Sequence, residues 1–521
     1  MSTSISHLSF QWADGSAVFD DLDLTVSQSR HGLVGLNGCG KSTLLRLIAG
    51  DLVPVGGTVS VDGRLAYLPQ DAGADSYRNV EEILGIAAIR AALSAVESGD
   101  AAVAHFDTIG NDWDIDEHAA ATLGRLGLGN LSLDRRVETL SGGELVLLSL
   151  ASKLLTEPDV LLLDEPTNSL DRAARQRLYD VVAAWRGTLL VVSHDRELLN
   201  LMDNIGELHD GGVRWFGGNF DDYEQAIAEE QRTAERAVRT AEGNVRKQER
   251  ELIEARIKLD RRKRYGQTMW DQKREPKIVM GARKRAAQES AGKHRNMHLE
   301  RLADANEHLD DAESKVRSDR EIRVDLPRTA VPEGRTVLTL SEVRLPYDGP
   351  VVELDVRGPE RIDLVGRNGA GKTTLLRTVV GDLSPESGDV RVHVPARYVP
   401  QKVDVLDDGL SVFDNAKALA PESTDNEVRT SLARFLFRGP KADQPAGSLS
   451  GGELLRATLA CLLLAEPAPQ LLLLDEPTNN LDLASIRQLG EALKSYKGAL
   501  IVASHDTAFL DEIGLTRIVG L

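Results

Sequence analysis

The chain has few cysteines and no long apolar run. Only two cysteines, Cys39 and Cys461, occur among its 521 residues, too few for the disulfide framework of a secreted domain. No apolar run approaches the roughly 18 residues that span a bilayer, so we expect no membrane span. The first residues, MSTSISHLSFQWADG, lack the basic region and the apolar stretch of a secretory signal. These absences favour a cytoplasmic protein.

Basic residues are outnumbered, with 62 Lys and Arg against 81 Asp and Glu, so the net charge of the chain is −19 at pH 7. An acidic balance of this size argues against indiscriminate coating of nucleic acid. Residues 261–300 are the exception, with twelve Lys and Arg against four acidic residues, which is a net charge of +8. The chain therefore carries one basic segment between acidic parts.

Four short strings occur twice, in the same order. GLNGCGKST (35–43) matches GRNGAGKTT (366–374), and LSGGE occurs at 140–144 and at 449–453. LLLDEPTNSLD (161–171) matches LLLDEPTNNLD (472–482), and VVSHD (191–195) matches VASHD (502–506). In the first copy, 22 additional residues separate the first string from the second. A domain-sized unit that is present twice indicates a duplication and not a solenoid.

The segment between the copies has a different composition. From about residue 223 to residue 320 it is rich in Ala, Glu, Arg, Lys and Gln, which is typical of long helices. Gly266, Pro276 and Gly281 interrupt its middle. We therefore expect two helices, about 223–264 and 283–320, joined by a loop and packed as an antiparallel hairpin.

The predicted organisation is an α/β fold with two P-loop domains and a helical linker. The short apolar runs before the repeated acidic strings are typical of parallel strands that are buried on both faces. We place the first P-loop domain at 1–222, the charged hairpin at 223–325 with its tip at about 261–300, and the second P-loop domain at 326–521.

The two Gly-rich strings match G-x-x-x-x-G-K-[ST] and predict two ATP-binding sites. Glycines let backbone N–H groups wrap around phosphates, and the following helix adds its N-terminal dipole. Lys41 and Lys372 are expected to reach the β and γ phosphates, and Ser42 and Thr373 to place a hydroxyl on Mg²⁺. The predicted phosphate-binding residues are Gly35, Asn37, Gly38, Cys39, Gly40, Lys41, Ser42 and Thr43 in the first copy and Gly366, Asn368, Gly369, Ala370, Gly371, Lys372, Thr373 and Thr374 in the second. Within the loop, Cys39 is better explained as a small neutral residue than as a redox group.

Each LLLDEPTN string ends an apolar strand on two acidic residues. Asp164 and Asp475 are expected to hold Mg²⁺ or its water. Glu165 and Glu476 follow directly, where a carboxylate can orient or deprotonate the attacking water. The alternative for each glutamate is a helix-capping or surface acid. Ligands of α/β sheets gather at the carboxyl ends of strands, which favours the catalytic interpretation.

Two further polar residues follow strands in each copy. His194 and His505 are expected to contact the γ-phosphate, as a sensor and an orienting group. Gln70 (in YLPQ) and Gln401 (in YVPQ) are expected to meet the phosphates and the metal and to report their presence to mobile parts of the protein. The alternative, an ordinary surface glutamine, is weakened by the repetition.

LSGGE places small residues at the start of a helix, where N–H groups can bind a phosphate. Because each P-loop already serves its own nucleotide, this second donor set suits a phosphate bound to the other copy. The residues are Ser141, Gly142, Gly143 and Glu144 in the first copy and Ser450, Gly451, Gly452 and Glu453 in the second. Trp12 precedes the first P-loop and is expected to stack on adenine, with a core aromatic as the alternative. In the second copy Tyr347 is the nearest candidate, and it is weaker.

Together these motifs resemble ATP-binding cassettes over about 400 residues. Two cassettes with a charged helical hairpin between them resemble the ABC-F family, as does RWFGGNFDDYEQ (214–225), which is similar to the stretch that leads into the family's linker. The resemblance implies two composite sites in one chain, a monomer, each joining one P-loop to the opposite LSGGE. It also implies ATP-dependent closure, and ribosome binding with the linker, through residues of about 261–300, reaching toward tRNA and the peptidyl-transferase centre. Family members regulate or rescue translation or displace antibiotics.

The chain departs from the family pattern after LSGGE. The family usually has Gln next and Arg two residues later, whereas the first copy has Leu145 and Leu147 and the second has Leu454 and Arg456. Equal turnover at the two sites is therefore not expected. Some members carry an arm of several tens of residues in the first cassette, and the 22 additional residues here predict a short arm or none.

Two other functions share the ATPase chemistry. The motor half of a membrane transporter would need a membrane partner and would give the basic hairpin no role. A DNA-acting ATPase of the SMC or repair type would have one cassette split by a coiled coil, whereas both copies here are whole. The hairpin itself has a simpler alternative as a solvated spacer, which would not explain why positive charge gathers at its tip.

Overall fold

The computed structural model describes residues 2–70, 79–271, 277–315 and 326–521. Internal contacts divide the chain into two compact units. The first unit comprises Met1–Asp222 and Glu321–Leu521 and contains both repeated copies, and the second is Tyr223–Arg320. Whether the three predicted segments fold as independent domains stays a prediction.

The first cassette is built on a mostly parallel sheet with the order β5-β6-β7-β3-β8-β9. The strands are β3 (Arg30–Val34), β5 (Leu65–Leu68), β6 (Val160–Asp164), β7 (Thr188–Val192), β8 (Asn204–His209) and β9 (Gly212–Gly217). Only β9 runs antiparallel to its neighbour. Every residue of β6 and β7 is buried, which confirms the prediction from their unbroken apolar runs. The connecting helices are α1 (Lys41–Ala49), α6 (Gly142–Leu155), α7 (Arg172–Ala184) and α8 (Arg196–Leu199).

A smaller antiparallel sheet, β2-β1-β4, completes the nucleotide-binding half of this cassette. Its strands are β1 (Thr3–Gln11), β2 (Ala17–Val26) and β4 (Gly56–Val61). Residues of both sheets and of α1, among them Leu8, Leu162 and Leu45, join one apolar core. This core holds the Gly-rich loop and α1 between the two sheets.

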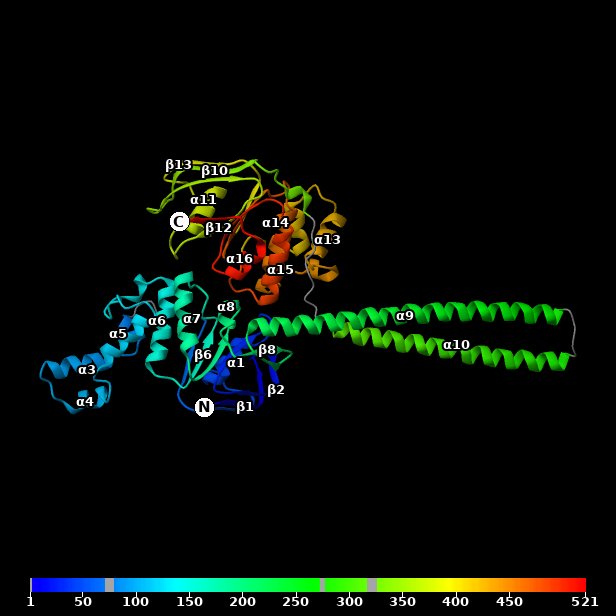
Figure 1. Cartoon of the computed structure of the whole chain (residues 1–521), viewed down its shortest axis with the longest axis horizontal. Helices are drawn as coiled ribbons and strands as arrows, with labels where there is room; N and C mark the ends of the chain where they lie inside the picture. Colours follow the sequence, from blue (N-terminus) through cyan, green and yellow to red (C-terminus); the bar gives the residue numbers. More distant parts are fainter. Residues whose placement is uncertain (1, 71–78, 272–276, 316–325) are drawn as a thin grey trace. The chain divides into compact units, whose positions relative to one another are not determined.

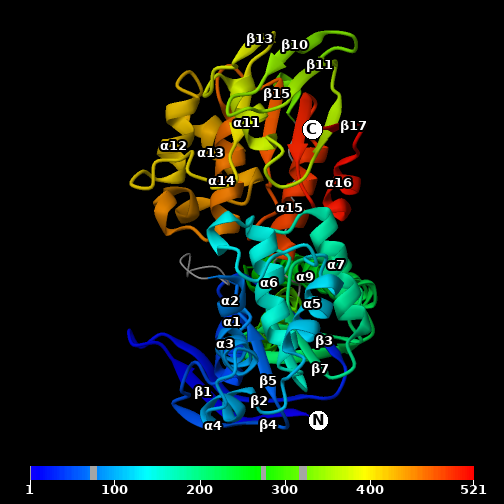
Figure 2. The same cartoon turned by 90° about the vertical axis from the view of Figure 1, so that its left-hand side faces the viewer.

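The second cassette repeats this plan. Its parallel sheet has the order β14-β15-β16-β12-β17, and its antiparallel sheet has the order β11-β10-β13. The strands are β10 (Thr336–Arg344), β11 (Val351–Arg357), β12 (Arg361–Val365), β13 (Ser387–Val392), β14 (Ala396–Val399), β15 (Leu471–Asp475), β16 (Ala499–Ala503) and β17 (Arg517–Gly520). The helices are α11 (Lys372–Val380), α12 (Val412–Leu419), α13 (Asp425–Arg434), α14 (Gly451–Leu464), α15 (Leu483–Lys494) and α16 (Thr507–Ile513). Helices α12, α13 and α14 pack together (Figure 2).

The additional residues of the first copy form two helices. Between Gly50 and Gly142 the first cassette has α2 (Val80–Ile83), α3 (Ala87–Glu97), α4 (Val103–Ile109) and α5 (Ile115–Arg125). Helices α3 and α4 have no counterpart between α12 and α13, which only residues 420–424 separate. They pack together, and the ring of Phe106 in α4 lies 5.9 Å from the ring of Trp113, which follows that helix.

The second unit is a helical hairpin, as predicted, but its helices are longer at the tip than we expected. Helix α9 (Phe220–Asp271) and helix α10 (Lys277–Ser314) run side by side (Figure 1). The prediction that Gly266 and Gly281 end the helices is wrong, since both lie inside them. One glycine costs a helix only about 1 kcal/mol, which the good helix formers around it offset. Pro276 lies outside the described residues.

Gly57 in β4 of the first cassette allows a close approach of two strands. Strand β1 has a positive φ of 52° at His7, where its register with β4 shifts. Gly57 faces this bulge at φ 86°, and a Cβ there would collide with the carbonyl group of His7. The same arrangement recurs at Gly388 and Glu342 in the second cassette. Gly50 has nearly the same φ of 82° but open space around it.

We predict that Gly57→Ala destabilises the first cassette more than Gly50→Ala does. Both variants bear the cost of a left-handed alanine, about 1–2 kcal/mol. Gly57→Ala also forces β1 away from β4, which adds at least about 1 kcal/mol. Thermal unfolding of the two purified variants measures the difference, and equal transition temperatures would contradict it.

Candidate ATP-binding and hydrolysis sites

Each Gly-rich loop ends at a helix whose first N–H groups are not capped by a side chain. Gly40 and Gly371 precede α1 and α11 with left-handed φ values of 106° and 99°, and neither helix start has a side-chain cap. Uncapped N–H groups with the helix dipole behind them form an anion site. A Cβ at Gly40 would lie 2.6 Å from Val18, so the loop conformation requires glycine.

The two P-loop lysines are buried but have different partners. Lys41 Nζ donates hydrogen bonds to the carbonyl oxygens of Gly35 at 2.7 Å and Leu36 at 3.0 Å. Lys372 Nζ donates to the Gly366 carbonyl at 3.0 Å and lies 2.8 Å from Nε2 of His505. Because an ammonium group can only donate, His505 accepts at Nε2. The ammonium groups therefore lie within the loops that are predicted to bind phosphate.

The donors around the predicted metal position suit Mg²⁺. Ser42 Oγ donates to Asp164 Oδ1 at 3.1 Å, and the Tyr67 hydroxyl donates to Asp164 Oδ2 at 3.3 Å. In the second cassette the Tyr398 hydroxyl donates to Asp475 Oδ2 at 3.0 Å. No group of three or more His, Cys, Asp or Glu residues that could hold a metal occurs in the described part of the chain. A cation here would depend on a carboxylate, a hydroxyl and the phosphates, which is how Mg²⁺ is usually held.

The predicted catalytic glutamates have strained backbones and buried side chains. Glu165 and Glu476 both have a φ of 46°. Strain of this kind in a non-glycine residue persists only where its surroundings enforce it, and it gathers at functional sites. Burial raises the pKa of Glu165 to about 8 and the pKa of Glu476 to about 7, against the lowering effect of Lys41 and Lys372 respectively.

The predicted histidines face these glutamates. In each cassette the imidazole Nε2 lies 3.3 Å from the glutamate Oε1, for His194 with Glu165 and for His505 with Glu476. Burial, and then the nearby lysine, lower the pKa of His194 to about 3 and that of His505 to about 4. Both imidazoles are therefore neutral at pH 7.

The LSGGE strings form capping boxes. Ser141 accepts a hydrogen bond from the Glu144 backbone at 3.3 Å, and Glu144 accepts one from the Ser141 backbone at 2.8 Å. Ser450 and Glu453 do the same at the start of α14. The glutamate side chain closes the capping box. The two glycines between the serine and the glutamate have no side chains, so their backbone is presented directly. Gly143 lies against the second P-loop, since a Cβ on it would be 3.8 Å from Asn368 Nδ2.

One cavity brings the two cassettes together at the second P-loop, a position that we call site two. It has a volume of about 380 Å³. The first cassette contributes Gly142, Ser169, Leu170 and Arg175, and the second contributes Arg367, Asn368, Gly369, Gly371, Lys372, Thr373, Thr374, Gln401, Asp475, Glu476, Asn479 and His505. The predicted phosphate, metal and catalytic residues thus share one space.

The corresponding position at the first P-loop, which we call site one, shows a reciprocal contact. Asn37 Nδ2 donates to the Asn480 carbonyl at 2.8 Å, and Asn368 Nδ2 donates to the Ser169 carbonyl at 2.8 Å. The Asn37 backbone also donates to Asp482 Oδ2 at 3.0 Å. The placement of Ser450–Glu453 opposite Lys41 stays a prediction.

Comparison with known proteins agrees with this geometry. The family described as "ABC transporter" matches residues 19–168 and 351–479. The tylosin resistance ATP-binding protein TlrC of Streptomyces fradiae is 32% identical over 95% of this chain and 92% of its own length. The energy-dependent translational throttle protein EttA of Mycobacterium tuberculosis is 31% identical over 95% of this chain and 87% of its own length. The chain belongs to the ABC-F family.

This ABC-F chain is an ATP-hydrolysing enzyme with tandem cassettes. Solved structures with a similar fold include the RNase-L inhibitor, with a TM-score of 0.59 and 21% identity over 98% of this chain and 86% of that one. None of the described helices combines the length and the apolar character that crossing a bilayer requires.

For several residues of the ABC-F chain, the predicted contact with the nucleotide or the metal stays a prediction. Trp12 is 40% exposed and packs edge-on against Phe10 at 5.1 Å, which does not fit the core alternative. Stacking of Trp12 on adenine stays a prediction, and Tyr347 is 80% exposed. Gln70 and Gln401 are both exposed at the ends of their strands. Burial raises the pKa of the Cys39 thiol, which agrees with a small neutral residue.

The structure adds residues that the sequence analysis missed. Tyr67 and Tyr398 hold the metal-site aspartates, and their signal was their repetition three residues before each Gln. Ser169 and Asn480 take left-handed φ values of 68° and 59° inside the repeated LLLDEPTN-x-LD strings and contact the opposite P-loop. Arg175 had no such signal, because it lies outside the repeated strings.

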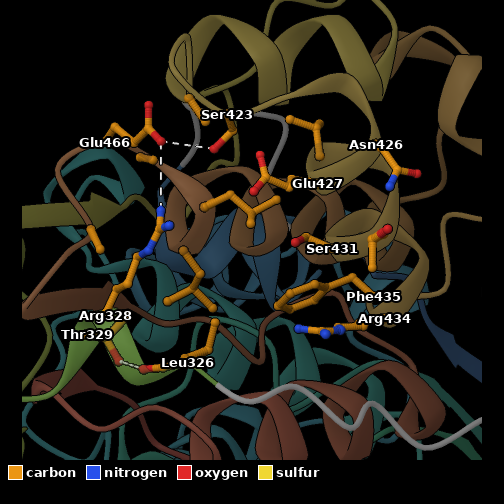
Figure 3. Close-up of a pocket in the computed structure, with 17 residues that line it drawn as sticks. Leu326, Arg328, Thr329, Ser423, Asn426, Glu427, Ser431, Arg434, Phe435 and Glu466 are labelled. Carbon is orange, nitrogen blue, oxygen red and sulfur yellow. Dashed lines mark hydrogen bonds and ion pairs between the residues drawn. The ribbon is translucent and has the colours of Figure 1, made fainter.

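A second cavity of about 460 Å³ lies in the second cassette, between α13 and the end of α14 (Figure 3). Its wall includes Leu326 and Phe435, and at its rim Ser423 donates to Glu466 at 2.9 Å, while Arg328 lies 3.9 Å from Glu466. None of the predicted site residues lines it. This second cavity therefore has no part in the predicted ATP chemistry.

The two P-loop sites are not equivalent. Lys41 bonds only carbonyl oxygens among its described partners, whereas Lys372 also contacts His505 and lies 3.8 Å from Glu476. In the helices that begin at the LSGGE strings, Leu147 of α6 is buried at 1% exposure, while the guanidinium of Arg456 of α14 lies 5.2 Å from the Phe437 ring.

We predict different ATP turnover in the single variants Glu165→Gln and Glu476→Gln, since each leaves a different site intact. We expect their kcat values to differ at least about twofold under identical conditions. Steady-state ATPase and nucleotide-binding measurements on both proteins test this. Matching kcat values together with matching nucleotide affinities would contradict the asymmetry.

Proposed function

We propose that this ATPase is a translation factor that binds the ribosome while its two cassettes are paired on ATP and leaves after hydrolysis. The observation that carries the proposal is the exposed basic cluster Arg261–Arg264 on α9, in a chain whose net charge is −19. The names of two relatives, a translational throttle protein and a tylosin resistance protein, support a role at the ribosome. A ribosomal partner would place the activity in the cytoplasm.

The proposed chemistry assigns one role to each group. Lys41 and Lys372 bind the β and γ phosphates, and the LSGGE glycines of the opposite cassette bind the γ-phosphate from the other side. Glu165 and Glu476 orient the attacking water and accept its proton at a carboxylate oxygen, and His194 and His505 orient that water and the γ-phosphate. When bound by Ser42 with Asp164, or by Thr373 with Asp475, Mg²⁺ would neutralise charge on the phosphates.

The proposed pairing is intramolecular and leaves the chain a monomer. The reciprocal contacts of Asn37 with Asn480 and of Asn368 with Ser169 support it. ATP at either site would add contacts between one P-loop and the opposite LSGGE, so that nucleotide favours closure.

We predict that the double variant Glu165→Gln/Glu476→Gln loses ATPase activity by about a hundredfold or more, because glutamine keeps the size of glutamate but cannot accept a proton. ATP binding should survive and trap the paired state. Steady-state ATPase and nucleotide retention after gel filtration measure the two effects. Substantial ATP turnover in the double variant would contradict the assignment of Glu165 and Glu476 as catalytic residues.

The hairpin supplies the charge that a ribosomal partner would recognise. The side chains of Arg261, Arg262, Lys263 and Arg264 are all exposed. A basic cluster on an acidic protein is drawn to a phosphate-lined channel, while the acidic remainder resists indiscriminate attachment. The side chains of Met269, Trp270, Ile278, Val279 and Met280, which we expect at the tip as apolar or base-stacking groups, lie outside the described ones.

We predict that the trapped double variant pellets with 70S-type ribosomes and that this binding weakens steeply with salt. Replacing Arg261, Arg262, Lys263 and Arg264 by Gln should weaken binding and flatten the salt dependence by about three units of slope, since each lost phosphate contact removes about 0.7–0.9 of a released ion. In the chain that keeps Glu165 and Glu476, the same four replacements should leave ATPase activity unchanged.

The matched control replaces Arg236, Arg239, Arg246 and Lys247, which are equally exposed on α9 but outside the tip. This control should keep most of the affinity and the slope. Salt-insensitive pelleting that survives loss of the tip cluster would contradict the RNA contact and favour the spacer alternative. Sedimentation with membranes in place of ribosomes would favour a transporter motor.

A further inference from the structure

Arg175 of the first cassette reaches a catalytic residue of the second. Its Nη1 donates a hydrogen bond to the backbone carbonyl of His505 at 3.2 Å. The same Nη1 lies 3.3 Å from Asp195 Oδ2, and Nε donates to the Leu170 carbonyl at 3.3 Å. The Arg175 side chain is only 12% exposed and lines the site-two cavity.

Asp195 holds the guanidinium in this position. Its Oδ2 also accepts the Tyr179 hydroxyl at 2.7 Å, and its Oδ1 caps α8 by accepting the Leu198 backbone N–H at 3.0 Å. The Asp195 side chain is 6% exposed. A buried, charge-assisted contact with this many constraints fixes the direction of the Arg175 hydrogen bonds.

The second cassette lacks this arrangement. At the matching repeat positions, Ile486 replaces Arg175 and Gly490 replaces Tyr179, while Asp506 keeps the place of Asp195. Asp506 caps α16 through the Phe509 backbone N–H at 2.9 Å. An isoleucine, buried here at 2% exposure, cannot donate to the carbonyl of His194 across the interface. The guanidinium contact therefore exists at site two and has no counterpart in Ile486.

We infer that Arg175 is a positioning residue for ATP hydrolysis at site two, where it holds His505 from the opposite cassette. The inference rests on the proposed roles of His505 and Glu476. His505 Nε2 lies 2.8 Å from Lys372 Nζ and 3.3 Å from Glu476 Oε1, so a shift of its backbone displaces the imidazole from both groups. Misplacement of a catalytic group by about 1 Å can cost as much as a hundredfold in rate.

Hydrolysis at site two then depends on engagement of the first cassette. When the cassettes separate, Arg175 moves away together with Asp195 and α7. The backbone carbonyl of His505 then loses the hydrogen bond that Arg175 donates to it. Site one would hydrolyse ATP without this requirement. The contact thereby couples pairing of the cassettes to turnover at one site.

The test isolates each site in the full-length chain. In the Glu165→Gln background only site two turns over, and in the Glu476→Gln background only site one does. Arg175→Met should lower kcat about tenfold in the first background, with KM for ATP changed less than about twofold. In the second background both constants should stay within about twofold. Arg175→Lys should recover part of the lost kcat, because an ammonium group can still donate to the carbonyl.

Arg177→Met is the matched control, since Arg177 lies two residues further along the same helix and its guanidinium packs against Gly127 of the first cassette. Residues two apart do not share a helix face. It should leave kcat unchanged in both backgrounds. Thermal unfolding of each variant checks folding, and Arg175→Gln provides a second, milder variant if Arg175→Met is unstable.

The outcomes separate this inference from the proposed site. Equal loss of kcat in both backgrounds, or loss without recovery by lysine, would overturn the positioning role and leave Arg175 as a structural tie between α7 and α8. No loss for either Arg175→Met or Arg175→Gln would overturn it as well. Residual turnover in Glu165→Gln/Glu476→Gln would instead overturn the assignment of the glutamates.

Discussion

A lysine ammonium buried at the end of a parallel sheet constrains each cassette. Lys41 and Lys372 are 7% and 8% exposed. A cation with so little water costs several kcal/mol unless other groups replace its hydration. Loop carbonyls supply these contacts, joined at Lys372 by His505 and Glu476. Glycines such as Gly40 take left-handed conformations that let the loop turn around the ammonium group.

A backbone hydrogen bond to the neighbouring strand explains why the strained glutamates are tolerated. The Glu165 backbone N–H donates to the Val192 carbonyl at 2.9 Å, and that of Glu476 donates to Ala503 at 2.7 Å. Both acceptors lie at the ends of strands β7 and β16, two residues before His194 and His505. One short contact therefore holds the glutamate in its left-handed conformation and sets its register against the histidine.

Most of the site could be predicted because its chemistry is local in sequence. A Gly-rich loop between strand and helix, or an acid at the end of an apolar run, carries its structural context within about ten residues. The hairpin was predictable as two helices, but not their bounds, since the cost of Gly266 and Gly281 is small against a long run of good helix formers. The cross-cassette contact of Arg175 was not predictable, because it joins positions 330 residues apart without a repeated string.

The contacts between the cassettes fall into two classes. Two of those inside the repeated strings are reciprocal, since Asn37 with Asn480 and Asn368 with Ser169 use the same atoms at the same distance. The second class involves residues outside the strings, as with Arg175 and His505, or Arg196 and Glu512 at 3.8 Å. Neither contact can recur with the cassettes exchanged, because Ile486 matches Arg175 and Thr507 matches Arg196.

One-sided contacts give the pairing a direction. If two second cassettes from different chains paired, Ile486 would face the His505 carbonyl and no guanidinium would be present. Pairing of a first with a second cassette keeps the Arg175 contact, and the linker between them raises their effective concentration. Because the reciprocal contacts alone would permit either pairing, the residues that differ between the copies, such as Arg175 and Ile486, disfavour the pairing of two second cassettes. The two sites could then become unequal without loss of the chemistry that the repeated strings share.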